Sequence, residues 1–128
     1  MPEEAPSGLK FTAQHEWVRD DGDVVTVGIT DYAQEQLGDV VYVDLPSPGA
    51  DVDLDQPFGE VESTKSVSDL FAPITGVIVE RNESLDERPE LVNRDPYGEG
   101  WMVTIRPADR SQLDALLDAD AYRASTAG

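Results

Sequence analysis

The chain contains no cysteine and a single histidine, His15, among its 128 residues. The absence of cysteine excludes a disulfide framework, a thiol nucleophile and a thiolate metal site. One histidine cannot form a multi-histidine metal site, and it leaves none spare for a relay of the serine-hydrolase kind. Any sulfur chemistry that the protein performs must therefore be supplied by an attached cofactor.

Basic residues are also scarce, since 9 Lys and Arg stand against 27 Asp and Glu, which gives a formal net charge of −18. Nucleic acids and anionic membrane surfaces both attract clustered Lys and Arg, so this composition argues against either partner. An acidic surface suits proteins with basic docking faces, but it also serves plain solubility, and charge alone does not separate the two. Only Lys10 and Lys65 are lysines, so the position of each is informative.

Long hydrophobic runs are missing as well. No apolar stretch approaches membrane-spanning length, and the acidic start lacks the apolar run of a targeting signal. We predict that residues 1–8 form a disordered tail and that residues 9–128 form a single domain, which is long enough to bury a core. The expected location is the cytoplasm, and self-repulsion of the acidic surface favours a monomer.

Alternating and β-branched apolar residues predict a mainly β fold. The expected strands cover residues 11–19, 24–29, 40–43, 58–62, 67–71, 77–79 and 101–105. Residues 89–100 are expected to be irregular. The expected helical segments run from a cap at residue 30 or 31 to residue 37, from residue 109 onward, and over about 120–124.

Lys65 lies in the segment Ser63-Thr64-Lys65-Ser66, between two of the predicted strands. This pattern predicts a hairpin with Lys65 at its tip, where an enzyme could reach the side-chain nitrogen while the strands fix its base. A swinging arm needs that combination of a rigid base and an exposed amine. Taken alone, however, a lysine in such a turn is most often an ordinary solvated residue.

The sequence context of Lys65 changes that interpretation. Residues 62–69, Glu-Ser-Thr-Lys-Ser-Val-Ser-Asp, resemble the lipoyl-lysine motif of the glycine cleavage H proteins. Other signatures of the same family are matched in order by residues 15–18, 27–41, 73–78, 91–93 and 96–102. The resemblance covers roughly residues 9–123. Thr64 replaces the hydrophobic residue often found there, and Thr64 and Ser66 differ from the neighbours typical of oxo-acid dehydrogenase lipoyl domains and biotin carriers.

The resemblance implies a barrel-sandwich hybrid of the lipoyl- and biotinyl-carrier type, with short helices that include a C-terminal helical segment. It implies a non-catalytic carrier with lipoate attached covalently to Lys65. The arm would receive the aminomethyl group of glycine from glycine decarboxylase (P protein) and deliver it to aminomethyltransferase (T protein). Dihydrolipoyl dehydrogenase (L protein) would then reoxidise the dithiol, and a lipoyl-attaching enzyme would have loaded the lysine.

Three acids acquire expected roles through the same resemblance. Glu62 and Asp69 flank the lysine at the family's positions, and we expect the lipoyl-attaching enzyme to recognise them. Glu16 would contact the amino group of the loaded arm when the arm folds back onto the body, because a carboxylate suits that contact by charge-assisted hydrogen bonding. We interpret His15 as structural, holding the start of a strand.

Other interpretations of the sequence stay open or are weaker. A lipoyl or octanoyl relay protein for other lipoate-dependent complexes would share the fold, and an unmodified interaction module could have kept it. Asp51, Asp53, Asp55 and Glu62 have the spacing of a calcium loop, but the required glycine is replaced by Gln56. Residues 96–101 are glycine-rich like a binding loop, yet we expect them to serve turns and a core tryptophan, with at most a share in the rim of the arm's cavity.

Overall fold

The structure, a computed structural model, describes residues 8–127 of the chain. Its strands are β1 (Lys10–Phe11), β2 (Glu16–Asp20), β3 (Val25–Ile29), β4 (Val40–Asp44), β5 (Asp51–Val52), β6 (Pro57–Ser63), β7 (Val67–Phe71), β8 (Gly76–Arg81) and β9 (Val103–Pro107). Its helices are α1 (Asp31–Leu37), α2 (Ser84–Glu87), α3 (Leu91–Arg94), the 3₁₀ segment η1 (Arg110–Ala115) and α4 (Ala119–Ala127). The predicted disordered tail lies outside the described residues, except for Gly8.

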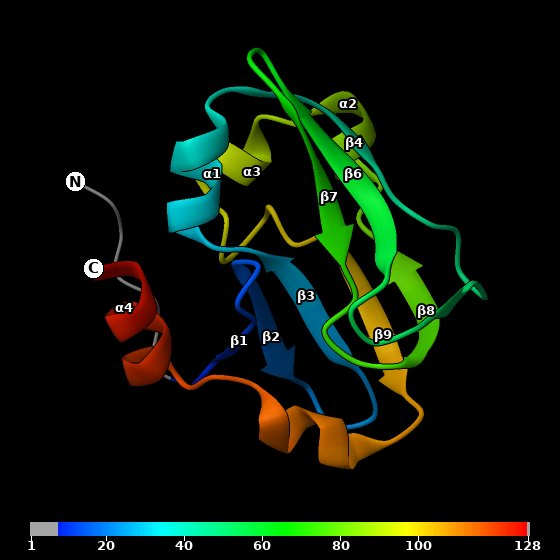
Figure 1. Ribbon diagram of the computed structural model, residues 1–128. Helices are drawn as coiled ribbons and strands as arrows, with labels where there is room; N and C mark the ends of the chain where they lie inside the picture. The colour runs from blue at the N-terminus through cyan, green and yellow to red at the C-terminus, as the bar shows by residue number, and fades with distance from the viewer. Residues whose placement is uncertain (1–7, 128) are drawn as a thin grey trace.

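Two antiparallel sheets form the body of the domain. The larger sheet has the strand order β1-β2-β3-β9-β8-β5, and the smaller has the order β4-β6-β7. Figure 1 shows the β6–β7 hairpin rising above the rest of the molecule, with α1 beside it and α4 next to β1. The main core contains buried side chains of both sheets, such as Val27 and Ile105 from the larger and Val61 and Leu70 from the smaller. These two packed sheets with short helices confirm the predicted mainly β, barrel-sandwich fold.

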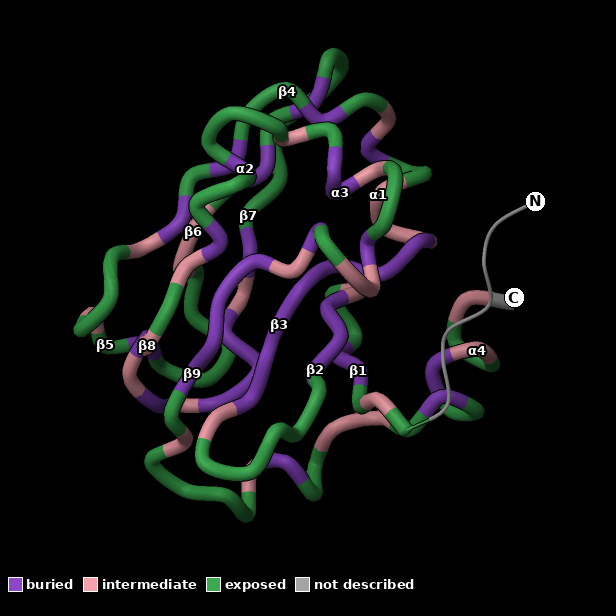
Figure 2. Tube along the Cα trace, turned by 180° about the vertical axis from the view of Figure 1, so that it is seen from behind, coloured by how far each residue is buried: buried purple, intermediate pink, exposed green. Residues whose placement is uncertain are grey.

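Strand β3 shows how the sequence builds this core. All five of its residues are buried, as the tube in Figure 2 shows from behind. Gly28 pairs with Trp17 of β2, and a Cβ on Gly28 would lie only 2.7 Å from the indole ring. Only glycine therefore leaves room for Trp17 to lie across β3. The indole Nε1 donates to the carbonyl of Pro96 at 2.9 Å, which ties the late glycine-rich segment to the sheet.

Two predicted strands have the wrong bounds. The strand expected over residues 11–19 is divided into β1 and β2 by a turn, because the hydroxyl of Thr12 accepts the backbone N–H groups of Gln14 and Glu16. Such local bonds compete with strand pairing. The last strand begins at Val103 instead of residue 101, since the N–H of Trp101 donates back to the carbonyl of Gly98 in a turn.

The predicted helices at residues 30–37 and at the C-terminal end are confirmed. Thr30 caps α1 by accepting from the N–H of Ala33 at 3.2 Å, and Gly38 ends the helix at φ +82°. The expectation of an irregular segment at 89–100 missed α3, and α2 was missed as well. Each has four residues, too few for a helical period to show in the sequence. No helix within residues 8–127 is long and apolar enough to cross a membrane.

Candidate functional site

Lys65 lies at the tip of the β6–β7 hairpin, as the sequence predicts. The two strands pair antiparallel as far as Glu62 and Val67, and the N–H of Ser63 then donates to the carbonyl of Ser66 at 2.8 Å. The lysine is exposed. The hairpin thus holds a primary amine in solvent on a base that is fixed by strand pairing.

Ser63 organises the tip and was not singled out from the sequence. Its hydroxyl accepts the N–H of Ser66 at 3.1 Å and that of Lys65 at 3.3 Å. Two-residue hairpin loops usually need residues with positive φ, but within residues 8–127 the only non-glycine residues in that region are His15 and Asp55. The serine hydroxyl therefore replaces the usual turn chemistry at Thr64 and Lys65. A serine two positions before the lysine was the signal available in the sequence.

The tip of the hairpin is tied to the end of α1, and α3 holds that end in place. The N–H of Thr64 donates to the carbonyl of Asp39, which directly follows the helix stop, at 3.0 Å. Asn93 of α3 accepts the N–H of Val40 and donates to the carbonyl of Gly38, both at 2.8 Å. A Cβ on Gly38 would lie 3.6 Å from Cε of Lys65, so the lysine stem passes close to the end of α1. These bonds connect α3, the end of α1 and the hairpin tip that carries Lys65.

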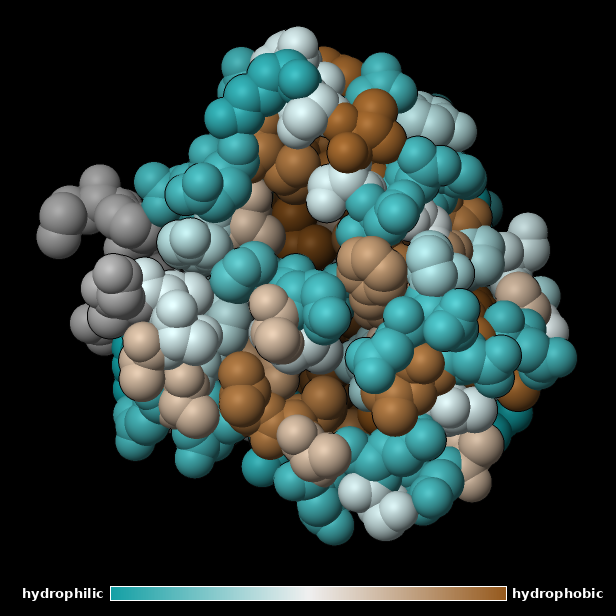
Figure 3. Space-filling model, in the orientation of Figure 1, coloured by the Kyte–Doolittle hydropathy of each residue, from teal (hydrophilic) through white to brown (hydrophobic). Residues whose placement is uncertain are grey.

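A cleft of about 480 Å³ opens between α1 and the hairpin. Figure 3 shows it as a hollow in the front face with an apolar floor and hydrophilic edges. It is lined by Gln14, His15, Glu16, Ile29, Tyr32, Ala33, Gln36, Leu37, Val61, Ser66, Val67, Ser68, Asp69 and Leu70. The cleft therefore begins beside the residue that follows Lys65 and reaches the turn before β2.

Glu16 is one of the residues that line this cleft, and it is almost fully buried, with 1% of its surface exposed. Its carboxylate accepts from the hydroxyl of Thr12 at 2.7 Å and from the N–H of Phe71 at 3.0 Å. Burial raises the pKa of Glu16 to about 7, although the two hydrogen bonds oppose that shift. Glu16 is thus not an ordinary surface acid. Each oxygen holds one bond and keeps a lone pair for another donor.

Glu62 and Asp69 occupy different places around the lysine. Glu62 pairs with Tyr42 on one side and Val67 on the other, and these two side chains are 55% and 56% exposed. Asp69 is exposed and lines the cleft, whereas Glu62 is exposed outside it. Two residues further from the tip, the three strands pair an acidic row: Asp44, Glu60 and Asp69. Like charges in facing positions destabilise a sheet, so this row does not serve the fold.

Other residues singled out from the sequence do not join this site. Within residues 8–127, no group of three or more His, Asp and Glu side chains could hold a metal ion. The segment 96–101 supplies no residue to the cleft lining. It packs against Trp17 instead, and Trp101 is half-buried beside the second core cluster rather than within a core. The segment is therefore structural, without a share in the cavity rim.

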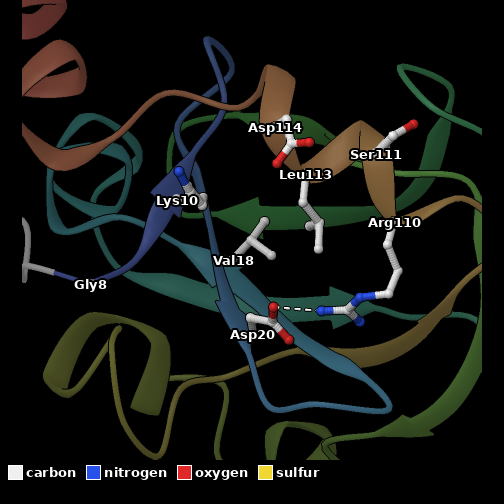
Figure 4. A pocket seen from close by; sticks show the side chains of 8 residues that line it. All are labelled: Gly8, Lys10, Val18, Asp20, Arg110, Ser111, Leu113 and Asp114. Atoms are coloured by element: carbon white, nitrogen blue, oxygen red, sulfur yellow. Dashed lines mark hydrogen bonds and ion pairs between the residues drawn. The ribbon is translucent and has the colours of Figure 1, made fainter.

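The other lysine, Lys10, lines a separate hollow of about 520 Å³ between β1, β2 and η1 (Figure 4). Its floor is apolar, formed by Val18 and Leu113. Arg110 crosses it and donates to the carboxylate of Asp20 at 2.6 Å and to the carbonyl of Gly22 at 2.7 Å. These two hydrogen bonds of Arg110 hold η1 against the β2–β3 turn. We therefore interpret the hollow as a place where structural elements pack together, and not as a binding site.

Fold and site together define a class of protein: a barrel-sandwich domain of the carrier type, which presents an exposed lysine at a hairpin tip beside a cleft. Comparison with known sequences identifies the family within that class. The family profile described as glycine cleavage H-protein matches residues 9–127. The chain belongs to this family.

Individual relatives agree with the profile. A glycine cleavage system H protein of Bacteroides thetaiotaomicron is 55% identical over 123 residues, which cover 96% of this chain and 98% of the relative. One from Anaeromyxobacter sp. is 56% identical over 121 residues and covers 94% of each chain. Among solved structures, a glycine cleavage system H protein from Mycobacterium marinum matches with a TM-score of 0.87 at 40% identity, covering 97% of this chain and all of that one.

Membership settles the kind of protein this is. The chain is a non-catalytic lipoyl carrier of the glycine cleavage system, it carries lipoate covalently on a lysine, and it interacts with the other components of that system. The absence of cysteine fits this role, because the redox sulfur belongs to the attached group.

Proposed function

We propose that Lys65 is the lipoylated lysine and that the chain carries the aminomethyl group of glycine from glycine decarboxylase to aminomethyltransferase. Dihydrolipoyl dehydrogenase would reoxidise the arm after each delivery. The observation that supports this most strongly is the position of Lys65: an exposed amine on a hydrogen-bonded hairpin tip, directly beside a cleft. Lys10 is also exposed, but it lies on β1 beside a hollow that Arg110 crosses.

The residues around Lys65 fit a lipoyl group. The cleft begins beside the tip and combines an apolar floor with polar edges. This combination suits an arm with a hydrocarbon chain and a polar aminomethyl group at its end. When attached, lipoate supplies the sulfur that accepts the aminomethyl group. The contribution of the chain is to shield that group from water and to release it to the next enzyme, so the cleft should bind weakly.

Within the cleft, we assign Glu16 to the amino group of the loaded arm. Its carboxylate is held in place by Thr12 and Phe71 yet keeps lone pairs free. We assign Glu62 and Asp69 to recognition by the lipoyl-attaching enzyme, since both are exposed within four residues of Lys65. We further propose that the protein acts as a monomer, because its charge of −18 opposes self-association, and that it works in the cytoplasm with the other glycine cleavage components.

The carrier cycle is tested by reconstitution with glycine decarboxylase. The lipoylated chain should support release of labelled CO₂ from carboxyl-labelled glycine, and unlipoylated chain should not. A relay protein would instead transfer its lipoyl group to other acceptor domains when incubated with a lipoyl transferase. CO₂ release at the level of the unlipoylated control, together with such transfer, would replace the carrier proposal with the relay alternative.

The assignment of Glu16 is tested by its replacement. Glu16→Ala should leave lipoylation intact but shorten the lifetime of the aminomethyl-loaded form about tenfold, the factor that a charge-assisted hydrogen bond of ~1.5 kcal/mol supplies. Lifetime is measured as release of formaldehyde and ammonia after loading. Glu60→Ala, which removes an exposed acid of β6 that does not line the cleft, is the control. An unchanged lifetime for Glu16→Ala would remove Glu16 from the arm contact.

A further inference from the structure

His15 adopts an unusual backbone conformation at the wall of the cleft. Its φ is +69°, a left-handed value that non-glycine residues rarely take. Its N–H donates to the carbonyl of Thr12 at 3.1 Å, and its carbonyl accepts from the N–H of Thr30 at 3.0 Å. Since His15 stands between Gln14 and Glu16, which both line the cleft, its conformation sets where those side chains point.

The side chain of His15 is held from the far end of the sequence. The hydroxyl of Tyr122, in α4, lies 2.9 Å from Nδ1 of His15 and 2.7 Å from Oγ1 of Thr30. Tyr122 is 2% exposed, and burial raises its pKa to about 12, so the hydroxyl stays protonated and can donate one of these two bonds while it accepts the other. Thr30 also caps α1, whose residues line the cleft beside His15. One hydroxyl thus joins the segment that carries Glu16 to the start of α1.

Aromatic packing follows the same path. Four rings form a row in the order Tyr32 of α1, His15 of the turn before β2, Tyr122 of α4 and Phe11 of β1. The centroids of successive rings lie 4.7, 5.6 and 4.8 Å apart. Tyr32 lines the cleft, whereas Phe11 is tied to the chain before α4 by two backbone bonds with Leu117, both of 2.8 Å. The row therefore leads from the anchored C-terminal segment to the cleft.

We propose that Tyr122 is a positioning residue for the arm: α4 uses its hydroxyl to hold His15 and Thr30, and thereby fixes the cleft wall that carries Glu16. None of the described α4 side chains lines the cleft, so the helix acts on the arm indirectly, through this contact. The inference rests on the proposed docking of the lipoyl arm in the cleft. It gives the C-terminal helix a role in retaining the aminomethyl group as well as in covering the sheet.

The test is Tyr122→Phe in the full-length lipoylated protein, which keeps the ring against Phe11 and removes only the hydroxyl. Side-chain ¹⁵N NMR should show that the Nδ1 resonance of His15 moves. The lifetime of the loaded form should fall about fivefold, as expected for one hydrogen bond of ~1 kcal/mol, while the rate of lipoylation stays unchanged. Tyr42→Phe, an exposed tyrosine on β4, controls for the substitution, and Thr30→Ser should preserve the His15 signal because it keeps the hydroxyl.

Two results would overturn this inference. If Tyr122→Phe lowers the unfolding temperature but leaves the His15 resonance and the loaded lifetime at wild-type values, α4 is only a structural cover. If the lifetime falls without any change at His15, the helix does not act through that residue. The NMR measurement needs no attached lipoate, so it can also be made on the unmodified chain. Failure of the carrier proposal would appear separately, as wild-type protein without lipoate on Lys65.

Discussion

The two lysines of this chain lie in regions that use their polar groups in opposite ways. Around Lys10, Arg110 donates to Asp20 and to a backbone carbonyl, and its bond to Asp20 holds the pKa of that carboxyl below its usual value. Around Lys65, the hydrogen bonds of Ser63 shape the backbone of the tip, and the lysine amine lies in solvent. In the first region, an ion pair holds η1 to the β2–β3 turn. In the second, the lysine amine is available for modification.

The comparison is sharpest in the outcome of replacing each lysine with arginine. Lys65→Arg should abolish lipoylation completely, because a guanidinium cannot form the amide and no second lysine lies at a hairpin tip. Lys10→Arg should be lipoylated like the wild type. Intact mass after expression with an active lipoyl-attaching enzyme measures both. Lipoate found on Lys10 in the Lys65→Arg variant would end the distinction between the two regions.

A smaller effect is expected on the pH dependence of stability, where Glu16, the buried acid of the cleft, should differ from exposed acids. The pKa of Glu16 is raised from 4.5 to about 7, so the folded state binds this proton more tightly than the unfolded state does. Stability from this group is therefore fully present below pH 4.5 and is lost as pH rises through about 7, by up to about 3 kcal/mol. Glu16→Gln should remove that decline in urea unfolding at pH 5 to 8, and Glu60→Gln should retain it. If the unfolding free energy of Glu16→Gln still falls between pH 5 and 8 as in the wild type, the fall is caused by other titrating groups.

The smallest expected effect compares two serines. Ser63→Ala removes the acceptor for two backbone N–H groups at the Lys65 tip, and Ser111→Ala removes a 2.6 Å bond to Asp109 beside the Lys10 hollow. Each should cost about 1 kcal/mol of unfolding free energy. Only Ser63→Ala should also slow lipoylation, by about threefold, since the tip loses its fixed shape. Equal lipoylation rates in the two variants would show that the shape of the tip does not matter to the attaching enzyme.

The sequence predicted those features that depend on local patterns. Alternating residues around Lys65 gave the hairpin and its tip, and Thr30 and Gly38 gave the bounds of α1. The turn at residues 12–15 was missed because it depends on a side-chain hydroxyl, that of Thr12, bonding to nearby backbone. The single-turn helices α2 and α3 were missed because four residues show no helical period.

The site was only partly predictable for a related reason. Glu16 was singled out through family resemblance, but its burial follows from contacts with Phe71, 55 residues away. Likewise, nothing local links Tyr122 to His15, which are 107 residues apart and meet only because α4 packs on β1. Long-range packing of this kind determines the pKa of an acid and the shape of a cleft wall, and single-sequence patterns do not report it.

The most direct test of the central claim is the mass of the peptide that contains residue 65. Protein expressed with an active lipoyl-attaching enzyme is digested and mapped by tandem mass spectrometry. The account predicts a lipoyl group on Lys65 and a bare Lys10. A bare peptide at residue 65, with the attaching enzyme shown to be active on a known acceptor, would contradict it.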